Sequence, residues 1–149
     1  MVDRRQDGPY EMVIASDLGQ VAHVQDHIGE RLKSCEFEDR DIFGIKLALA
    51  EALVNAIKHG NRLDSRKKVR IQIQVCGERI DIGIADEGPG FNPDQVADPL
   101  AAENLERPSG RGLLLMRHYM TEVTYHPPGN RVTMSKIRPN GNGNGNGKQ

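Results

Sequence analysis

Two segments of the chain alternate apolar and polar residues strictly, VRIQIQV at residues 69–75 and RIDIGIAD at residues 79–86. A period of two places every apolar side chain on one face of a strand, so both segments predict half-buried strands. Gly77 and Glu78 between them favour an antiparallel hairpin. Residues 10–15, 121–125 and 131–137 predict three further strands, the last two forming a hairpin around the turn PPGN.

Three other segments repeat apolar residues at helical spacing. The first helix is capped by Ser16 or Asp17 and ends near Ser34. The second covers residues 39–59 and ends before a Gly-Asn pair, and the third is a short helix at residues 113–120. Half-buried strands joined by hairpins need helices on one face only. The pattern therefore predicts an α+β protein, a two-layer sandwich of an antiparallel sheet and helices.

The second helix is apolar around most of its circumference. Two apolar faces are expected to be buried, one around Ile45, Leu49 and Leu53 and the other made of Phe43, Leu47, Ala50 and Val54. Apart from Lys46, the polar residues after Ile42 fall within about 80° of one another at 100° per residue. They are Glu51, Asn55, Lys58 and His59.

Glu51 and Asn55 lie one turn apart on this polar stripe and could serve a cavity together. A carboxylate accepts protons, and a carboxamide oxygen is a hard ligand suited to a Mg²⁺ ion that keeps several waters. The alternative is that the stripe is the exposed edge of an amphipathic helix, with His59 interacting with the dipole at the C-terminal end.

A second candidate binding segment, Asp86-Glu87-Gly88-Pro89-Gly90, follows the predicted strand at residues 79–86. Glycines permit tight backbone geometry and close approach of a ligand, and a carboxylate at a strand end can accept hydrogen bonds from an amino group such as adenine N6. The alternative is an ordinary turn. The segment is neither a Walker A loop nor a dinucleotide-binding fingerprint.

A third candidate segment, Ser109-Gly110-Arg111-Gly112, precedes the last predicted helix. Backbone N–H groups near the glycines and the positive end of the helix dipole would form an anion site, to which Arg111 adds a bidentate phosphate donor. The alternative is a loop followed by a helix cap.

The composition agrees with one ordinary globular domain. The chain has 149 residues, of which 37% are hydrophobic and 28% charged, and its formal net charge is −1. This charge, with three Tyr, three Phe and no Trp, provides neither an electrostatic footprint nor stacking platforms for nucleic acid, so no nucleic-acid partner is expected. Because the chain has no run of about 18 apolar residues and no apolar leader, we expect no membrane association and a cytoplasmic location.

The ends of the chain differ from its middle. We expect a flexible N-terminus at residues 1–9, a single domain at residues 10–138 and a disordered Asn-Gly tail at residues 139–149, because the tail has no apolar residue to anchor it. Cys35 and Cys76 have no CxxC spacing, so we expect buried thiols and neither a disulfide framework nor a zinc site.

Taken in order, LALAEALVNAIKHGN, IADEGPGFNP and SGRGLLLMR resemble the N, G1 and G2 boxes of the GHKL (Bergerat-fold) ATPase superfamily. Within it, the chain is similar to the bacterial anti-sigma-factor serine/threonine kinases, which are histidine-kinase-like ATPase domains of about this length. The resemblance covers roughly residues 15–137. It implies a two-layer α/β sandwich in which a mixed, mostly antiparallel sheet carries helices on one face.

The resemblance also implies that the protein uses ATP and Mg²⁺. Glu51 would be the general base or the residue that positions the attacking group, and Asn55 would bind Mg²⁺. Asp86 would bind adenine N6, and residues 98–109 would form a lid over the nucleotide. The other residues implied in nucleotide binding are His59, Gly88, Gly90, Gly110, Arg111, Gly112 and Leu113.

By this resemblance the protein would phosphorylate a small anti-anti-sigma antagonist of the STAS type, and it would bind a sigma factor when that antagonist is phosphorylated. A homodimer is also implied. The dimerisation helix of a sensor histidine kinase and the transducer domain of the large ATPases are not expected in 149 residues. Two alternatives remain: a nucleotide-gated protein that sequesters a partner without catalysis, and a structural domain that binds no nucleotide.

Overall fold

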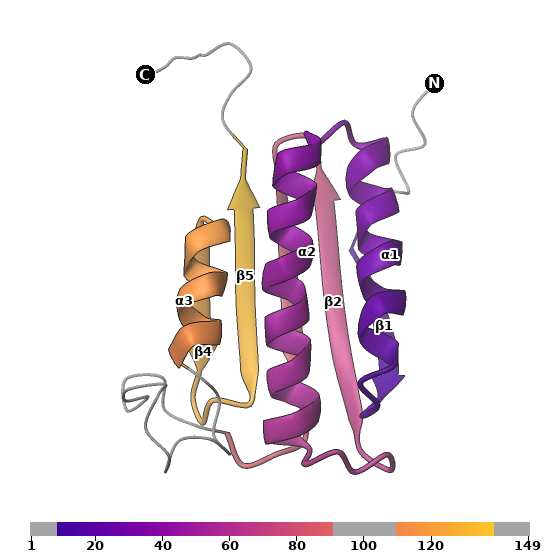
Figure 1. Ribbon diagram of the computed structural model, residues 1–149, viewed down its shortest axis with the longest axis vertical. Helices are drawn as coiled ribbons and strands as arrows, with labels where there is room; N and C mark the ends of the chain where they lie inside the picture. Colours follow the sequence, from indigo (N-terminus) through magenta and orange to yellow (C-terminus); the bar gives the residue numbers. More distant parts are fainter. Residues whose placement is uncertain (1–8, 91–109, 139–149) are drawn as a thin grey trace.

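The computed structural model describes residues 9–90 and 110–138, which form one layer of helices packed on one face of a five-stranded sheet (Figure 1). The elements in chain order are β1 (Tyr10–Ala15), α1 (Gln20–Ser34), α2 (Asp39–Val54), η2 (Asn55–Gly60), β2 (Lys68–Cys76), β3 (Arg79–Ala85), α3 (Gly110–Tyr119), β4 (Glu122–His126) and β5 (Arg131–Ile137). The α+β sandwich predicted from the sequence is confirmed.

The strands lie in the order β1-β2-β3-β5-β4. Every pairing among the described strands is antiparallel, so the expectation of a mixed sheet is wrong for this part of the chain. Hairpins join β2 to β3 and β4 to β5, whereas β3 and β4 run parallel on either side of β5, with α3 between them in the chain. The expected flexible N-terminus, except Pro9, and the expected tail lie outside the described residues.

The alternating segments pair as predicted. In β2 the residues facing the helices are fully buried and their neighbours are exposed along the whole strand, and β3 follows the same period. Opposite each other lie Ile71 and Ile84, and Ile73 and Ile82, so both strands present one continuous apolar face. Cys76 ends β2 on the exposed face, so the expectation that it is a buried thiol is wrong, and Cys35 is half-buried.

Helix α1 buries the apolar residues that its spacing predicts, Val24, Ile28 and Leu32. The Asp17 carboxylate accepts a hydrogen bond from the Gly19 N–H at 2.9 Å, which supports the turn that leads into the helix. Among the described residues, no helix has both the length and the apolar character needed to cross a bilayer.

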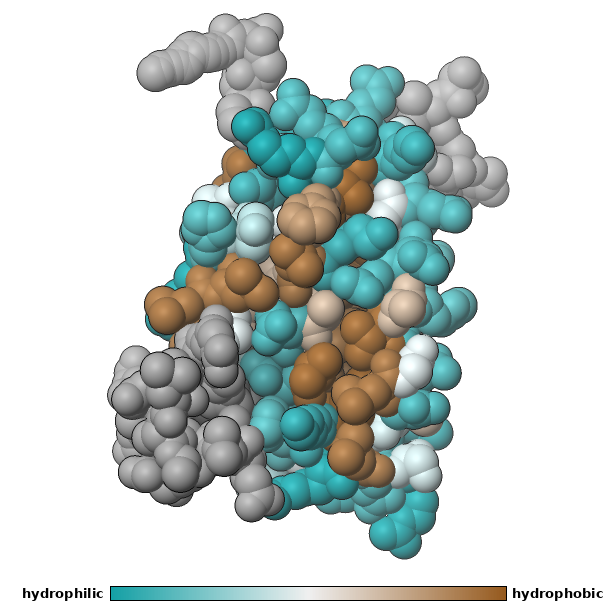
Figure 2. All heavy atoms as spheres, viewed as in Figure 1, coloured by the Kyte–Doolittle hydropathy of each residue, from teal (hydrophilic) through white to brown (hydrophobic). Residues whose placement is uncertain are grey.

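Helix α2 buries only one of its two apolar faces. Ile45, Ala48 and Leu49 are buried against the sheet, whereas Phe43 is 61% exposed. Leu47, Ala50 and Val54 are half-buried, so the expectation that this second face is buried is wrong. The reason is that the helices form a single layer. α1 and α3 lie on either side of α2, and no described element packs on the face of α2 that points away from the sheet. Figure 2 accordingly shows hydrophobic residues gathered on the outside of the helical layer.

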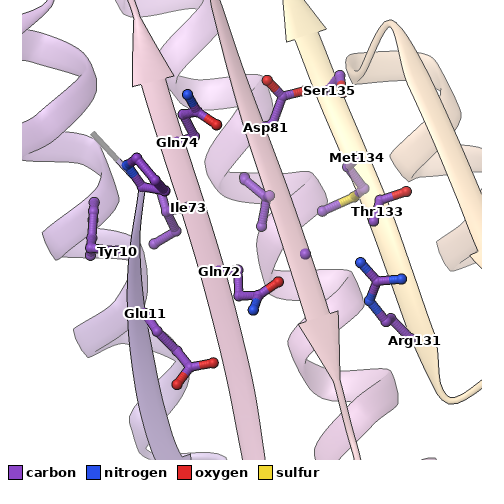
Figure 3. A pocket seen from close by; sticks show the side chains of 13 residues that line it. Tyr10, Glu11, Gln72, Ile73, Gln74, Asp81, Arg131, Thr133, Met134 and Ser135 are labelled. Carbon is purple, nitrogen blue, oxygen red and sulfur yellow. Dashed lines mark hydrogen bonds between the residues drawn. The ribbon is translucent and has the colours of Figure 1, made fainter. Parts of the chain in front are cut away.

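The opposite face of the sheet carries polar side chains and is not covered by helices (Figure 3). Glu11, Gln72, Asp81, Arg131 and Thr133 stand around a shallow hollow on this face. An antiparallel sheet commonly leaves one face to solvent, and the polar half of each alternating strand is its sequence signature. None of the residues predicted to bind nucleotide lines this hollow, so the candidate site lies elsewhere.

Candidate functional site

The three segments singled out in the sequence meet at one end of the helical layer (Figure 1). The end of α2 with η2, the loop after β3 and the first turn of α3 contribute one segment each. Two close approaches join them, since the Glu51 carboxylate lies against Gly112 and the Asp86 carboxylate lies against Gly60. Residues far apart along the chain therefore form one candidate site.

The helix that the spacing predicts over residues 39–59 changes its winding at Asn55. Residues Asn55–Gly60 form a π-helical turn, in which the Asn61 N–H bonds to the Ala56 carbonyl at 2.8 Å. Because this turn is wider than α-helix, positions beyond Asn55 rotate away from those of an α-helical wheel. The predicted polar stripe is split accordingly, with Glu51 and His59 half-buried, Asn55 buried and Lys58 exposed.

Asn61 fixes the end of the π-helical turn to three other segments. It is fully buried, and its Nδ2 donates to the Ser16 hydroxyl at 2.8 Å and to the Lys68 carbonyl at 3.0 Å. Its Oδ1 accepts a hydrogen bond from the Glu87 N–H at 2.7 Å. The sequence suggested only a helix stop at this residue. The structure shows that its amide holds the loop after β3 against the helix, with all its buried polar atoms satisfied.

Asp86 occupies a half-buried position between this turn and the β4–β5 connection. Its Oδ1 accepts a hydrogen bond from the Gly88 N–H at 2.7 Å, and its own N–H donates to the Asn130 carbonyl at 2.9 Å. Burial raises the pKa of the Asp86 carboxyl to about 6, against the opposing effects of the Gly88 bond and of Lys67. The carboxylate therefore has hydrogen-bonding capacity left for a ligand donor.

The glycines of the second segment are required by close packing. A Cβ at Gly88 would collide with the Gly60 carbonyl, and one at Gly90 would collide with the Pro128 carbonyl. Gly90 also has φ of 88°, in the region that favours glycine. The loop after β3 thus lies directly on η2 and on the β4–β5 turn, and this packing fixes the direction of the Asp86 side chain.

The third segment begins α3 instead of preceding it. The helix starts at Gly110, ahead of the predicted start at Leu113, so Gly110, Arg111 and Gly112 belong to its first turn. The first four N–H groups of a helix have no acceptor within the helix. They point out of its N-terminal end, which carries the partial positive charge of the helix dipole. A Cβ at Gly112 would lie only 2.7 Å from Glu51 Oε1, so glycine allows the Glu51 carboxylate to reach this turn.

One residue at the site has no signal in the three motifs. Tyr125 lies on β4, and its ring packs against the core with its hydroxyl oxygen buried. Burial raises the pKa of the Tyr125 phenol, the Asn55 side chain and Arg117 act in the opposite direction, and Asp86 and Glu51 add to the increase. Its place in the strand predicted at residues 121–125 gave no chemical signal, because a tyrosine in a strand is usually a packing residue.

The position of Asp86 predicts a pH-dependent stability. Because its pKa is raised to about 6 in the folded protein, against an ordinary 3.8, the wild type gains stability as the pH falls through 6 toward 4. Above pH 6 it carries the full cost of a partly desolvated charge. We expect Asp86→Asn to melt a few degrees higher than the wild type at pH 8 and at the same temperature near pH 4, as thermal unfolding across this range would measure. A difference in melting temperature between the two proteins that grows as the pH falls would contradict the raised pKa of Asp86.

These residues suit a purine nucleotide bound with a metal ion. Asp86 offers a carboxylate to an amino group, the first turn of α3 offers N–H groups to phosphate, and Glu51 adds a carboxylate close to that turn. Asn55 is only 9% exposed and presents a carboxamide, a ligand type that Mg²⁺ accepts together with phosphate oxygens and water. The donor set therefore fits Mg²⁺ bound through Asn55.

Comparison with known proteins identifies the family of the domain. Residues 14–136 match the family model described as the histidine kinase-like ATPase domain. The chain is 34% identical over 96 residues to the anti-sigma F factor of Clostridium perfringens strain SM101, a match that covers 62% of this chain and 68% of the relative. It is 33% identical over 103 residues to the serine-protein kinase RsbW of Bacillus subtilis strain 168, covering 64% of each.

A solved structure has a similar fold. It contains the RsbU and RsbW domains of Rv1364c from Mycobacterium tuberculosis, and it superposes with a TM-score of 0.61 at 18% sequence identity. The match covers 88% of this chain and 33% of that chain. At this identity the likeness concerns the fold, and it agrees with the two-layer architecture expected from the hydrophobic pattern.

Proposed function

Because the chain belongs to the histidine kinase-like ATPase family, we propose that it is an ATP-dependent protein serine/threonine kinase that acts as an anti-sigma factor. The observation that carries the proposal is the Glu51 carboxylate lying against Gly112 in the first turn of α3. This places a proton acceptor beside the N–H groups best suited to phosphate. A domain that only bound a partner would not need a carboxylate there.

In this proposal each segment of the site has one task. Asp86 accepts a hydrogen bond from the adenine amino group, while Gly88 and Gly90 keep its loop against η2 and the β4–β5 turn. The N–H groups at residues 110–113 hold phosphate oxygens, with Arg111 as a further phosphate donor. His59 precedes Gly60, the η2 residue that lies against the Asp86 loop, and is proposed as a further nucleotide-binding residue.

Glu51 is the proposed general base. Its carboxylate takes the proton of the attacking Ser or Thr hydroxyl, while the surrounding donors stabilise charge on the transferred phosphoryl group. Asn55 would hold Mg²⁺, which when bound supplies further charge neutralisation at the phosphates. The buried position of Asn55 keeps its carboxamide fixed relative to Glu51, one helical turn away.

The proposed protein substrate is a small anti-anti-sigma factor of the STAS type, and the proposed sequestered partner is a sigma factor. The names of the relatives support this, since one is an anti-sigma F factor and others are serine-protein kinases. We also propose a cytoplasmic location and self-association into a homodimer, with no direct binding to nucleic acid or membrane. The proposed lid, residues 98–109, lies outside the described residues.

The direct test is transfer of labelled γ-phosphate to candidate anti-anti-sigma proteins from the same host. Incorporation into Ser or Thr of one candidate supports the kinase. ATP-dependent capture of a sigma factor without phosphate transfer to any candidate would replace it with the nucleotide-gated switch. The absence of a thermal shift on addition of Mg-ATP would contradict both.

The contact between Gly112 and Glu51 gives a sharper prediction. In Gly112→Ala the new methyl group would displace the end of a flexible side chain and no backbone atom, so folding should change little. The Glu51 carboxylate would move away from α3, and we expect phosphotransfer to fall by about 10- to 100-fold. This loss is smaller than the loss expected when the general base is removed. Gly77→Ala, at a turn with open space around it, is the matched control. Equal loss in both variants would contradict the contact's role.

A further inference from the structure

A closed ring of hydrogen bonds ties the loop after β3 to the end of the helical layer and to the start of β2. The Asn61 Oδ1 accepts the Glu87 N–H at 2.7 Å, and the Glu87 carboxylate accepts the Lys68 N–H at 2.5 Å. The Lys68 carbonyl in turn accepts the Asn61 Nδ2 at 3.0 Å. Each residue is bonded to the other two, and these three residues form the Asn61 clamp.

The clamp is anchored in the protein interior. Asn61 is fully buried, and its Nδ2 also donates to the Ser16 hydroxyl at 2.8 Å, which itself donates to the Lys67 carbonyl at 2.7 Å. A buried carboxamide that turned would leave several polar groups without partners, at a cost of about 1–3 kcal/mol for each group. The Asn61 amide is therefore fixed, and its Oδ1 fixes the position of the Glu87 N–H.

The clamp acts beside the residue that is proposed to bind the base. Asp86 directly precedes Glu87, and the Asp86 carboxylate lies against Gly60, the residue before Asn61. Gly88, on the other side of Glu87, lies against the Gly60 carbonyl. The backbone on both sides of the clamped N–H therefore packs on the end of η2.

The same loop is held from a second side by Asn130. The Asn130 carbonyl accepts the Asp86 N–H at 2.9 Å, and the Asn130 Nδ2 donates to the Gly88 carbonyl at 3.2 Å. A loop held from one side alone can turn about that side, so the direction of the Asp86 carboxylate depends on both. Because a hydrogen bond weakens steeply as its angle closes, such a turn would affect a bond to a ligand amino group before it affected distant phosphate contacts.

We propose that the Asn61 clamp is a positioning device that fixes the direction of the Asp86 carboxylate and thereby sets the preference of the site for a purine with an amino group at position 6. The proposal rests on the proposed function of the site. It adds Asn61 and Glu87, neither of which was expected to take part in nucleotide binding. Neither residue touches the nucleotide in this proposal, since each supports the group that binds it.

The test compares, by calorimetry, the affinities of the full chain for Mg-ATP and for the magnesium complex of inosine triphosphate, which has a carbonyl oxygen in place of the 6-amino group. The wild type is expected to bind ATP at least about tenfold more tightly, because a carboxylate accepts a bond from the amino group and repels the carbonyl oxygen. In Asn61→Ala we expect ATP affinity to fall about 3- to 10-fold and inosine triphosphate affinity to stay within about twofold. In Glu87→Ala the expected fall in ATP affinity is about 2- to 5-fold.

Ser16→Ala is the matched control, because it removes a bond on the interior side of Asn61 and leaves the bond to Glu87. Asn61→Ala and Ser16→Ala should both melt at a lower temperature than the wild type. Ser16→Ala should nevertheless keep the wild-type ratio of ATP affinity to inosine triphosphate affinity. If this ratio falls as far in Ser16→Ala as in Asn61→Ala, general loosening of the fold explains both and the proposal is overturned.

A double-mutant cycle shows whether the effect passes through Asp86. In an Asp86→Asn background, neither Asn61→Ala nor Glu87→Ala should change the affinity ratio further, and a further fall would overturn the proposal. If Asn61→Ala does not fold, Glu87→Ala decides the outcome, because its side chain is exposed.

The remaining outcomes separate this inference from the proposed function. If the wild type prefers ATP and the clamp variants keep that preference, the inference fails while the proposed function stands. If the wild type binds both nucleotides equally well, the inference fails together with the assignment of Asp86 to adenine. If the wild type binds no ATP, the inference and the proposed function both fail.

Discussion

Replacing Glu51 with Gln is expected to lower phosphate transfer by about 10²- to 10⁴-fold, the range for loss of a general base. The carboxamide keeps the size of the side chain and its place against Gly112 but cannot take a proton. ATP affinity should change by less than about 1 kcal/mol, since the groups proposed to hold adenine and phosphate are unchanged. The comparison is phosphate incorporation at saturating Mg-ATP alongside calorimetric affinity.

Glu38→Gln is the matched control for this experiment. Glu38 flanks the opposite end of α2, and its carboxylate is exposed and pairs with Arg40 only across 3.6 Å at the surface. Such a pair contributes little, so both phosphate transfer and folding should be unchanged. Wild-type transfer rates in Glu51→Gln would show that another group accepts the proton. Sequestration of a partner should survive in the variant.

Replacing Asp86 with Asn is expected to weaken ATP binding by about 10- to 150-fold, or about 1.5–3 kcal/mol, the range for a hydrogen bond to a charged group. Gly88 N–H already binds Oδ1 at 2.7 Å. If the carboxamide keeps that bond, its amino group occupies the place of the second oxygen. A donor then faces the adenine amino group, which is also a donor, so the loss should be larger than that of one neutral bond.

Calorimetry measures this loss, with Asp26→Asn as the control because Asp26 is an exposed residue of α1. The pH experiment gives an independent check on the same side chain, since Asp86→Asn is expected to be more stable than the wild type at pH 8 while binding ATP less well. Unchanged ATP affinity in a folded Asp86→Asn variant would contradict its assignment to adenine. Reduced stability at pH 8 would instead indicate that the carboxylate has a favourable partner in the folded protein.

The sequence by itself determined the architecture, because strict alternation and helical spacing fix which side of each element is apolar. β2 and β3 could form only half-buried strands, and two layers are the simplest way to bury one face of a sheet. The order of the three motifs also indicated one site built from a helix end, a strand end and a helix start. These features depend on local pattern, which a single sequence carries in full.

The tertiary structure decided what surrounds each element. Periodicity shows that a helix face is apolar but not whether another element covers it. Phe43 on the outer face of α2 was therefore expected to be buried, and it is exposed because no described element covers that face. Periodicity could not show the π-helical turn, whose end at Asn61 is bonded to Ser16 after β1, to Lys68 of β2 and to the loop after β3. Tyr125 enters the site for the same reason. Strand order brings β4 under α3, and contacts between residues distant along the chain leave no periodic trace in the sequence.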